Sequence, residues 1–189
     1  NLPPNNYGHW KLDRNHPEWQ DVILTDWAQL GVNSTHLNIW PQNNSFEISP
    51  SYRKAIEDYV ALSRKHGLKV GIRLDALGGT DGWPMNPSNP DNVIKPYLRW
   101  VKEIAAMLKG QAAYYILGDE MTIVKTEHDT PAKDWTAEKY IEYFSQISAA
   151  IKNIDPKVKI SMFAIGGGNW KYAEYLFEKG FSRYGDGVA

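Results

Sequence analysis

Two adjacent carboxylates, Asp119 and Glu120, are the residues of this sequence best suited to proton-transfer chemistry. They follow the apolar and aromatic run Tyr114–Leu117, whose residue types are those of a buried strand, and a single Gly118 separates the run from the acids. In α/β folds, ligands bind at the carboxyl ends of parallel strands, so acids placed there can exchange protons with a substrate. The alternative interpretation is a solvated turn, and the other strands decide between the two.

A second strand, predicted at 32–40, carries polar groups on one face. Because side chains alternate along a strand, His36, Asn38 and Trp40 share the face opposite Leu37 and Ile39. We expect Asn38 and Trp40 to contact substrate near the end of this strand, with Trp40 as a stacking platform or, equally, a core residue. His36 is more often a hydrogen-bonded core histidine than a catalytic base.

The strand predicted at 68–75 ends in Arg73 and Asp75, which point away from its apolar face. They are candidates for substrate binding or for an internal ion pair, and Arg73 could also orient a nucleophile. The long loop that follows is rich in Gly and Pro and contains Trp83. Loops of this length in compact domains are usually functional or disordered, so sugar stacking and loop packing are both open for Trp83.

Two later loops contain further candidates. Trp170 follows Gly166–Gly168 after a predicted strand, and it is a second candidate for sugar stacking. The segment Glu127–Asp129 has potential metal ligands, but a solvated loop is the favoured interpretation, and we predict no metal site. The potential glycosylation sites at Asn33 and Asn43 are uninformative without the source of the protein.

The apolar periodicity predicts strands and helices that alternate along the chain, which indicates a parallel sheet with right-handed crossovers. Strands are predicted at 5–10, 32–40, 68–75, 113–118, 157–163 and from 186, and helices at 17–30, 50–66, 96–109, 136–153 and 170–179.

An open doubly wound sheet and a (β/α)8 TIM barrel both fit this alternation. The polar faces of the strands at 32–40 and 68–75 favour the barrel, because the middle strands of an open sheet are apolar on both faces. Neither a dinucleotide-binding Gly-x-Gly-x-x-Gly nor a Walker loop is present, so no cofactor is expected. A full barrel needs about 250 residues. We therefore expect residues 1–189 to be a single barrel domain truncated at its carboxyl end, with about strands 1 to 6 present.

The composition restricts the partners. A net charge of −1 gives no electrostatic basis for binding nucleic acid or an anionic membrane, and no apolar run is long enough to span a bilayer. The absence of cysteine excludes disulfides, thiolate metal sites and a cysteine nucleophile. The sequence begins without the pattern of a signal peptide. Eight Trp, eleven Tyr and five Phe fit either a large aromatic core or a sugar-stacking groove.

Three segments resemble clan-A glycoside hydrolases. In that clan a helix leads to a fourth strand that ends in W-x-x-G/N-N-E, where the Glu is the general acid/base; here Tyr115–Glu120 occupies that place. Tyr140–Ile160 resembles the next unit of the clan, in which an I-K-x-x-D-P-x-x-K segment leads into the fifth strand, and Tyr184–Ala189 resembles the start of the sixth. The resemblance implies a (β/α)8 barrel that hydrolyses glycosidic bonds with retention of configuration, using Glu120. A secreted or periplasmic location is favoured.

The sequence departs from the clan in two ways. Asp119 stands where the clan has an Asn that donates to the sugar 2-hydroxyl, and an ionised Asp can only accept. The clan's nucleophilic Glu ends a seventh strand, which this sequence does not contain. No residue here is therefore assigned as the nucleophile.

Two alternatives stay open. An Asp-Glu pair after a fourth strand also resembles the β-N-acetylhexosaminidases, in which the Asp orients the substrate 2-acetamido group and no protein nucleophile is needed. A non-catalytic carbohydrate-binding barrel would need only the aromatic groove. The main prediction is a glycoside hydrolase that acts on poly- or oligosaccharides. Its sugar, linkage and oligomeric state are left open.

Overall fold

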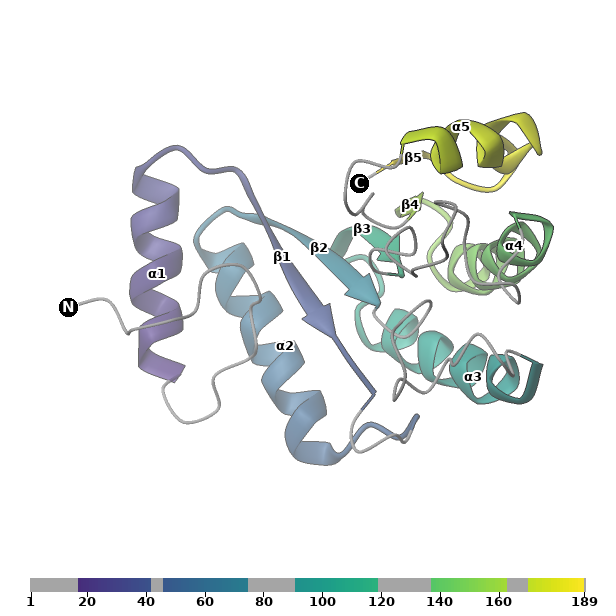
Figure 1. Cartoon of the computed structure of the whole chain (residues 1–189). Coiled ribbons are helices and arrows are strands. Elements are labelled where there is room, and N and C mark those ends of the chain that lie inside the picture. Colours follow the sequence, from purple (N-terminus) through teal and green to yellow (C-terminus); the bar gives the residue numbers. More distant parts are fainter. Residues whose placement is uncertain (1–16, 42–45, 75–90, 119–136, 163–169, 189) are drawn as a thin grey trace, which may run out of the picture.

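The structure is a computed structural model, and it describes residues 17–41, 46–74, 91–118, 137–162 and 170–188 (Figure 1). In these residues helices and strands alternate along the chain. Their order is α1 (Pro17–Gln29), β1 (Ser34–Ile39), α2 (Pro50–Lys65), β2 (Lys69–Leu74), α3 (Asp91–Met107), β3 (Ala112–Leu117), α4 (Ala137–Ile154), β4 (Lys159–Met162), α5 (Trp170–Glu178), the short 3-10 helix η2 (Phe181–Arg183) and β5 (Gly187–Val188).

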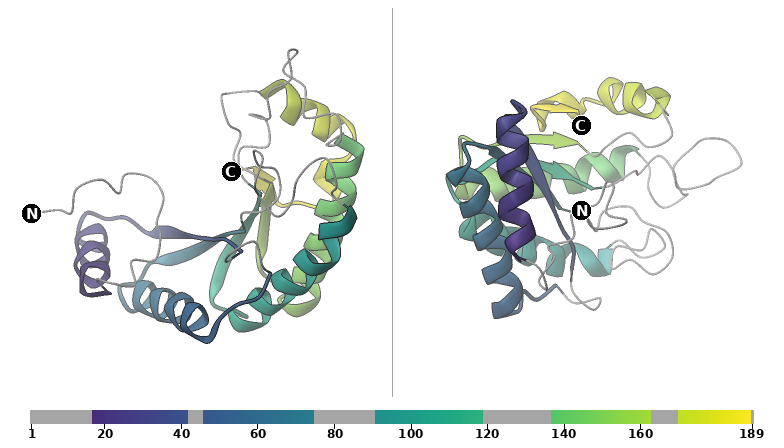
Figure 2. Two further views of the ribbon diagram at one scale, coloured as in Figure 1. Left: turned by 60° about the horizontal axis from the view of Figure 1, so that its bottom comes forward. Right: turned by 90° about the vertical axis from the view of Figure 1, so that its left-hand side faces the viewer.

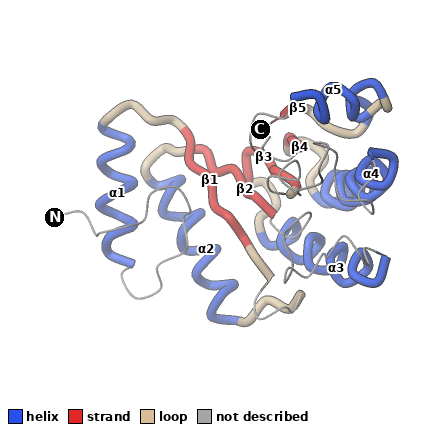
Figure 3. Tube along the Cα trace, viewed as in Figure 1, coloured by secondary structure: helices blue, strands red, loops and turns tan. Residues whose placement is uncertain are grey.

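The strands form one parallel sheet whose spatial order is the chain order, β1-β2-β3-β4-β5. The sheet is curved, and the helices lie around its convex side as an open ring (Figure 2, left). Figure 3 shows the same separation, with strands inside and helices outside. A doubly wound sheet would carry helices on both faces and would reverse its strand order. The observed arrangement is that of a barrel.

Local sequence signals explain where the elements begin and end. The Ser49 hydroxyl accepts a hydrogen bond from the Tyr52 backbone N–H at 3.3 Å and so caps α2, and Pro50 occupies the first helical turn. Left-handed glycines follow the helix ends as predicted, and they are Gly31, Gly67, Gly110 and Gly180. Helix α4 ends instead at the Asp155-Pro156 turn.

The hydrophobic core lies between the convex face of the sheet and the helices. It confirms the predicted alternation, because Leu37 and Ile39 of β1 are fully buried on this face. The main core side chains are Leu37, Ile39, Val70, Ile72, Leu74, Tyr115, Leu117 and Ile160 from the strands, and Ile56, Val60, Trp100, Val101, Ile104, Phe144, Ile147 and Ile151 from the helices.

The predicted bounds agree with the structure to within a few residues, with one correction. The helix predicted to begin at Pro96 begins at Asp91, and Pro96 lies inside it. A proline inside a helix removes the hydrogen bond from its own nitrogen, and its ring clashes with the carbonyl four residues earlier. The burial of the neighbouring Tyr97 and Trp100 offsets this cost. The strand predicted at 5–10 lies outside the described residues.

Within the described part of the chain, no helix combines the length and the apolar character needed to cross a membrane.

Candidate functional site

The carboxyl ends of β1, β2 and β3 meet at one edge of the sheet because these strands are parallel. Leu74 and Leu117, the last residues of β2 and β3, are register partners. Beyond them the backbone N–H of Gly118 donates to the carbonyl oxygen of Leu74 at 3.1 Å. The chain segments that continue into Asp75 and into Asp119 and Glu120 therefore leave the sheet from neighbouring strands.

A row of side chains crosses the inner, concave face just below this edge. Asn38, Arg73, Ile116 and Ser161 are successive register partners on β1, β2, β3 and β4. The sequence predicted that Asn38 and Arg73 share a face, and the structure places them side by side in this row. The apolar side chain of Ile116 lies between the polar pair Asn38 and Arg73 on one side and Ser161 on the other.

The buried polar atoms of this row have unused hydrogen-bonding capacity. Asn38 is only 1% exposed, and neither its amide nitrogen nor its amide oxygen has a hydrogen-bond partner among the described residues. The Oγ of Ser161 is also buried, and in the described structure nothing bonds to it. Because buried polar groups are almost always hydrogen-bonded, these positions are suited to hold water or a polar ligand.

Two register positions further from the edge, on the same face of the sheet, Tyr114 lies against Gly71. The two residues are register partners, and a Cβ atom built on Gly71 would come within 2.2 Å of the Tyr114 ring. The ring therefore occupies the space that a side chain at position 71 would fill. Burial raises the pKa of the Tyr114 phenol. Tyr114 thus contributes a neutral hydroxyl and an aromatic face to the concave side.

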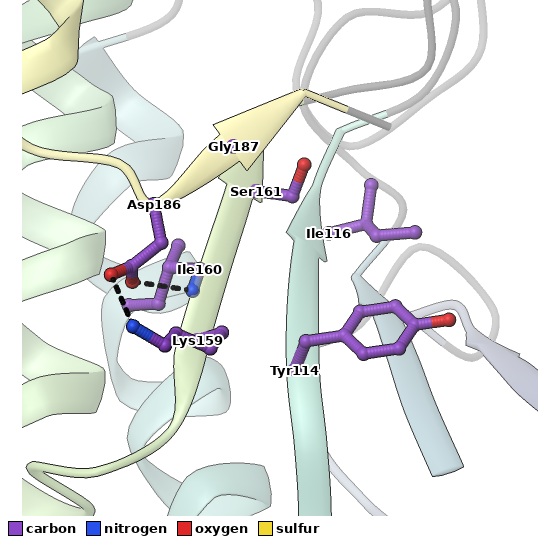
Figure 4. Close-up of a pocket in the computed structure, with 7 residues that line it drawn as sticks. All are labelled: Tyr114, Ile116, Lys159, Ile160, Ser161, Asp186 and Gly187. Atoms are coloured by element: carbon purple, nitrogen blue, oxygen red, sulfur yellow. Dashed lines mark hydrogen bonds and ion pairs between the residues drawn. The ribbon is translucent and has the colours of Figure 1, made fainter. Parts of the chain in front are cut away.

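A cavity of about 520 Å³ opens on the concave face over β3, β4 and β5 (Figure 4). Its lining residues are Tyr114, Ile116, Lys159, Ile160, Ser161, Asp186 and Gly187. Of the predicted site residues whose side chains the structure describes, Asn38, Trp40 and Arg73, none lines it. In complete barrels the interior is filled by side chains from all the strands. We therefore interpret this cavity as the open interior of the sheet.

Asp186, one of the lining residues, is held by a cluster of hydrogen bonds and ion pairs. Its carboxylate accepts hydrogen bonds from the Ile160 backbone N–H at 2.9 Å and from the ammonium groups of Lys152 and Lys159 at 3.0 and 3.3 Å. Partial burial opposes its ionisation, but the N–H of Ile160 and the two lysines outweigh burial and hold the Asp186 pKa below its ordinary value. This arrangement fastens β5 to β4 and leaves little capacity for a substrate.

The structure describes the other predicted site residues only in part or not at all. Trp40 directly follows β1 and is half-buried, and its backbone N–H donates to the Tyr52 hydroxyl at 3.2 Å. Trp170 is the first residue of α5, and its side chain is not described. Asp75, Trp83, Asp119 and Glu120 lie outside the described residues, as does Glu127–Asp129. Among the residues that the structure describes, no group of three His, Asp or Glu could hold a metal ion.

Sequence reasoning missed Tyr114, Gly71 and Ser161 as parts of the concave face. The signal was available for Tyr114, because the alternation that places Tyr115 and Leu117 in the core also places Tyr114 and Ile116 on the opposite face. The residue types of the run instead favour a strand buried on both faces, and the structure buries only one of them fully. Ser161 alternates in the same way with the buried core residue Ile160.

No family model matches the sequence, and no curated protein matches it. Solved structures do match its fold. A β-mannanase from the blue mussel Mytilus edulis has a TM-score of 0.64 at 14% identity, covering 96% of this chain and 64% of its own. A GH5_18 enzyme from Streptomyces cattleya, in complex with Manb1-4GlcNAc, has a TM-score of 0.63 at 16% identity and covers 81% and 40%. The exo-β-1,4-mannosidase from Opitutaceae bacterium strain TAV5 has a TM-score of 0.60 at 20% identity and covers 77% and 28%.

The fold is that of a (β/α)8 barrel. The described sheet represents part of such a barrel, and the predicted likeness to clan-A glycoside hydrolases is confirmed at the level of the fold. The chain spans less than two thirds of the length of each of these three structures. At such low identities the similarity shows that the folds are alike, and it does not show that the proteins share a reaction.

Proposed function

We propose that the protein is a glycoside hydrolase of poly- or oligosaccharides in which Glu120 is the general acid/base. The proposal rests on the sequence and contacts at the end of β3. There the Gly118 N–H is hydrogen-bonded to Leu74 at the end of β2, and the next two residues in sequence are Asp119 and Glu120. In (β/α)8 barrels, catalytic groups come from the carboxyl ends of the strands. The mannan- and mannoside-active enzymes among the similar structures favour β-linked mannosides as the first substrates to test.

In the proposed reaction, protonated Glu120 gives its proton to the glycosidic oxygen as the bond to the anomeric carbon breaks. A second carboxylate, to which no residue is assigned, attacks the anomeric carbon and forms a glycosyl-enzyme. Glu120 then removes a proton from the water that hydrolyses this intermediate, so the configuration is retained. A neighbouring ionised Asp119 would raise the pKa of Glu120 by like-charge repulsion and keep it protonated near neutrality.

The remaining predicted residues are assigned to substrate binding. Asn38 and Arg73 lie one rung below the sheet edge, where their amide and guanidinium groups can hydrogen-bond hydroxyls or water. The burial and unused hydrogen-bonding capacity of Asn38 support this role. Trp40, Asp75, Trp83 and Trp170 follow strand ends in the sequence and are proposed to line the sugar sites around them.

The test is hydrolysis by the full-length protein of aryl β-mannosides, β-glucosides and β-N-acetylglucosaminides, together with mannan. Glu120→Gln should lower kcat on the preferred substrate by about 10²–10⁴-fold, the usual contribution of general acid catalysis. Glu127→Gln makes the same change in a segment interpreted as a solvated loop, and it should leave kcat within about twofold of wild type. Equal activity of Glu120→Gln and wild type would remove Glu120 from the mechanism.

The Asp119-Glu120 pair favours a second candidate, substrate-assisted hydrolysis of N-acetylated sugars. This mechanism predicts strong preference for the N-acetylglucosaminides and a loss of at least a hundredfold in Asp119→Asn. Sugar binding without hydrolysis of any substrate would instead indicate a carbohydrate-binding barrel.

A further inference from the structure

Three buried tyrosines connect helices to the ends of the strands that precede them. The Tyr52 hydroxyl of α2 accepts the Trp40 backbone N–H after β1. The Tyr97 hydroxyl of α3 donates to the carbonyl oxygen of Leu74 at the end of β2, and the Tyr140 hydroxyl of α4 donates to that of Leu117 at the end of β3, both at 3.4 Å. In these last two pairs the residues are 23 positions apart, so the same contact recurs in successive strand-helix units.

One peptide unit, formed by the Leu117 carbonyl and the Gly118 N–H, is contacted directly by Tyr140 and indirectly by Tyr97, through the oxygen that accepts its N–H. Tyr140 donates to its carbonyl oxygen, and its N–H donates to Leu74 at 3.1 Å. The Leu74 oxygen that receives this N–H also receives the Tyr97 hydroxyl. The peptide unit is thus hydrogen-bonded through both its carbonyl and its N–H. Tyr140 bonds the carbonyl directly, and Tyr97 bonds the Leu74 oxygen that accepts the N–H.

The orientation of this peptide sets the direction of the chain beyond it. Gly118 has φ +92°, a left-handed conformation in which a side chain would be strained. Rotation of the Leu117–Gly118 plane would turn the start of the segment that continues into Asp119 and Glu120. A catalytic group displaced by about 1 Å can lose about 10²-fold in rate, so a fixed peptide immediately before the acids has catalytic value.

We infer that Tyr97 and Tyr140 are positioning residues for the acid pair, acting through the Leu117–Gly118 peptide. The inference rests on the proposed role of Glu120. Both tyrosine contacts are longer than the usual 2.5–3.0 Å of an O–H···O hydrogen bond. Each is therefore expected to restrain the peptide weakly, and the two together more strongly.

The experiment compares Tyr97→Phe, Tyr140→Phe and the double variant with a matched control, Tyr59→Phe, in the full-length protein. Phenylalanine keeps the buried ring and removes only the hydroxyl. The Tyr59 hydroxyl is also buried, but it shares its 2.9 Å hydrogen bond with Thr35 near the amino end of β1, at the opposite edge of the sheet. The control therefore reports the general cost of deleting a buried tyrosine hydroxyl.

Two readouts separate positioning from stability. The first is solvent exchange of the Gly118 amide, followed by NMR in protein labelled with 15N-glycine, under conditions where the native state predominates. The second is kcat and KM on the preferred substrate. In Tyr97→Phe and Tyr140→Phe we expect faster exchange of Gly118 and a kcat lower by about two- to tenfold, with KM nearly unchanged. Tyr59→Phe should change neither readout, even where it lowers the melting temperature.

Unchanged Gly118 exchange in the double variant would overturn the inference, and so would kcat losses no larger than in Tyr59→Phe. Glu120→Gln is measured in parallel to separate this outcome from failure of the proposed function. If Glu120→Gln is fully active, the general-acid role fails and the positioning of that acid fails with it. If Glu120→Gln is inactive while the double variant matches the control in both readouts, only the positioning inference fails.

Discussion

At the scale of single residues, the pair formed by Gly71 and Tyr114 gives the sharpest prediction. A methyl group on Gly71 would meet the Tyr114 ring at 2.2 Å, and both residues lie within the sheet. Gly71→Ala should therefore destabilise the protein by about 1–3 kcal/mol, the usual cost of overpacking a well-packed site. The measurement is the free energy of unfolding in urea.

A double-mutant cycle with Tyr114→Ala tests the stated cause. Removing the ring creates room for the methyl group, so Gly71→Ala should cost at least 1 kcal/mol less in the Tyr114→Ala background. Equal costs in both backgrounds would mean that contact with the ring is not the reason for glycine at this position.

Asp186 gives a prediction about pH. Its lowered pKa means that its stabilising contribution is fully present above the pKa of an unfolded aspartate, about 3.9, and is lost as pH falls through the folded value. Asp186→Asn should cost about 0.5–1.5 kcal/mol near pH 7, because it weakens charge-assisted hydrogen bonds that solvent partly screens. The difference from wild type should shrink below about pH 4.

The matched control is Asp58→Asn, which removes an exposed i,i+4 pair with Lys54. Exposed pairs of this kind contribute about 0.3–0.5 kcal/mol, so this variant should stay close to wild type. Urea unfolding at a series of pH values measures both variants. A pH-independent deficit in Asp186→Asn would show that its charge is not what stabilises the fold.

Some features of the site follow from the sequence of a single strand, and others depend on how the strands pair. Asn38 and Arg73 were placed on one face correctly, because strand alternation is local and needs no tertiary information. Gly71 and Tyr114 could not be paired in advance, because the contact depends on the register between two strands separated by a whole helix. The acid pair after Gly118 was chosen for its chemistry, and its role stays a proposal.

At the scale of elements, the contact between two turns is the most testable feature. Asp155, at the end of α4, is only 9% exposed, and its carboxylate accepts the Gly110 backbone N–H at 2.7 Å. It therefore joins the turn before β4 to the turn before β3. This Asp belongs to the D-P segment that carried part of the resemblance to clan-A enzymes, and the structure gives it a structural role.

Asp155→Ala should destabilise the protein by about 1–3 kcal/mol, because the Gly110 N–H loses its acceptor. Asp155→Asn keeps an acceptor oxygen and should cost less than half as much. Thermal and urea unfolding of the two variants provide the comparison. An equally large loss in both would contradict the explanation based on a missing acceptor.

Most elements were predictable because their apolar periodicity is strong and their ends carry Gly, Pro or Ser signals. The start of α3 was not, because the sequence predicts this helix only from Pro96. In the structure the packing of Tyr97 and Trp100 maintains a helix that begins at Asp91.

At the scale of the whole molecule, the sequential strand order and the helices on one face define part of a (β/α)8 barrel (Figure 2). Both features follow from the strand-helix alternation and the right-handed rule for parallel crossovers. That residues 1–189 form a single domain truncated at its carboxyl end remains a prediction.

The central claim, that Glu120 is the general acid, is tested most directly by the dependence on the leaving group. The measurement compares wild type and Glu120→Gln of the full-length protein on 2,4-dinitrophenyl, 4-nitrophenyl and unactivated alkyl glycosides of one sugar. Because a good leaving group departs without protonation, the account predicts a small loss of kcat/KM on the dinitrophenyl substrate. The loss should rise to about 10²–10⁴-fold on the alkyl glycoside. The same loss on all three substrates, or no loss on any of them, would contradict it.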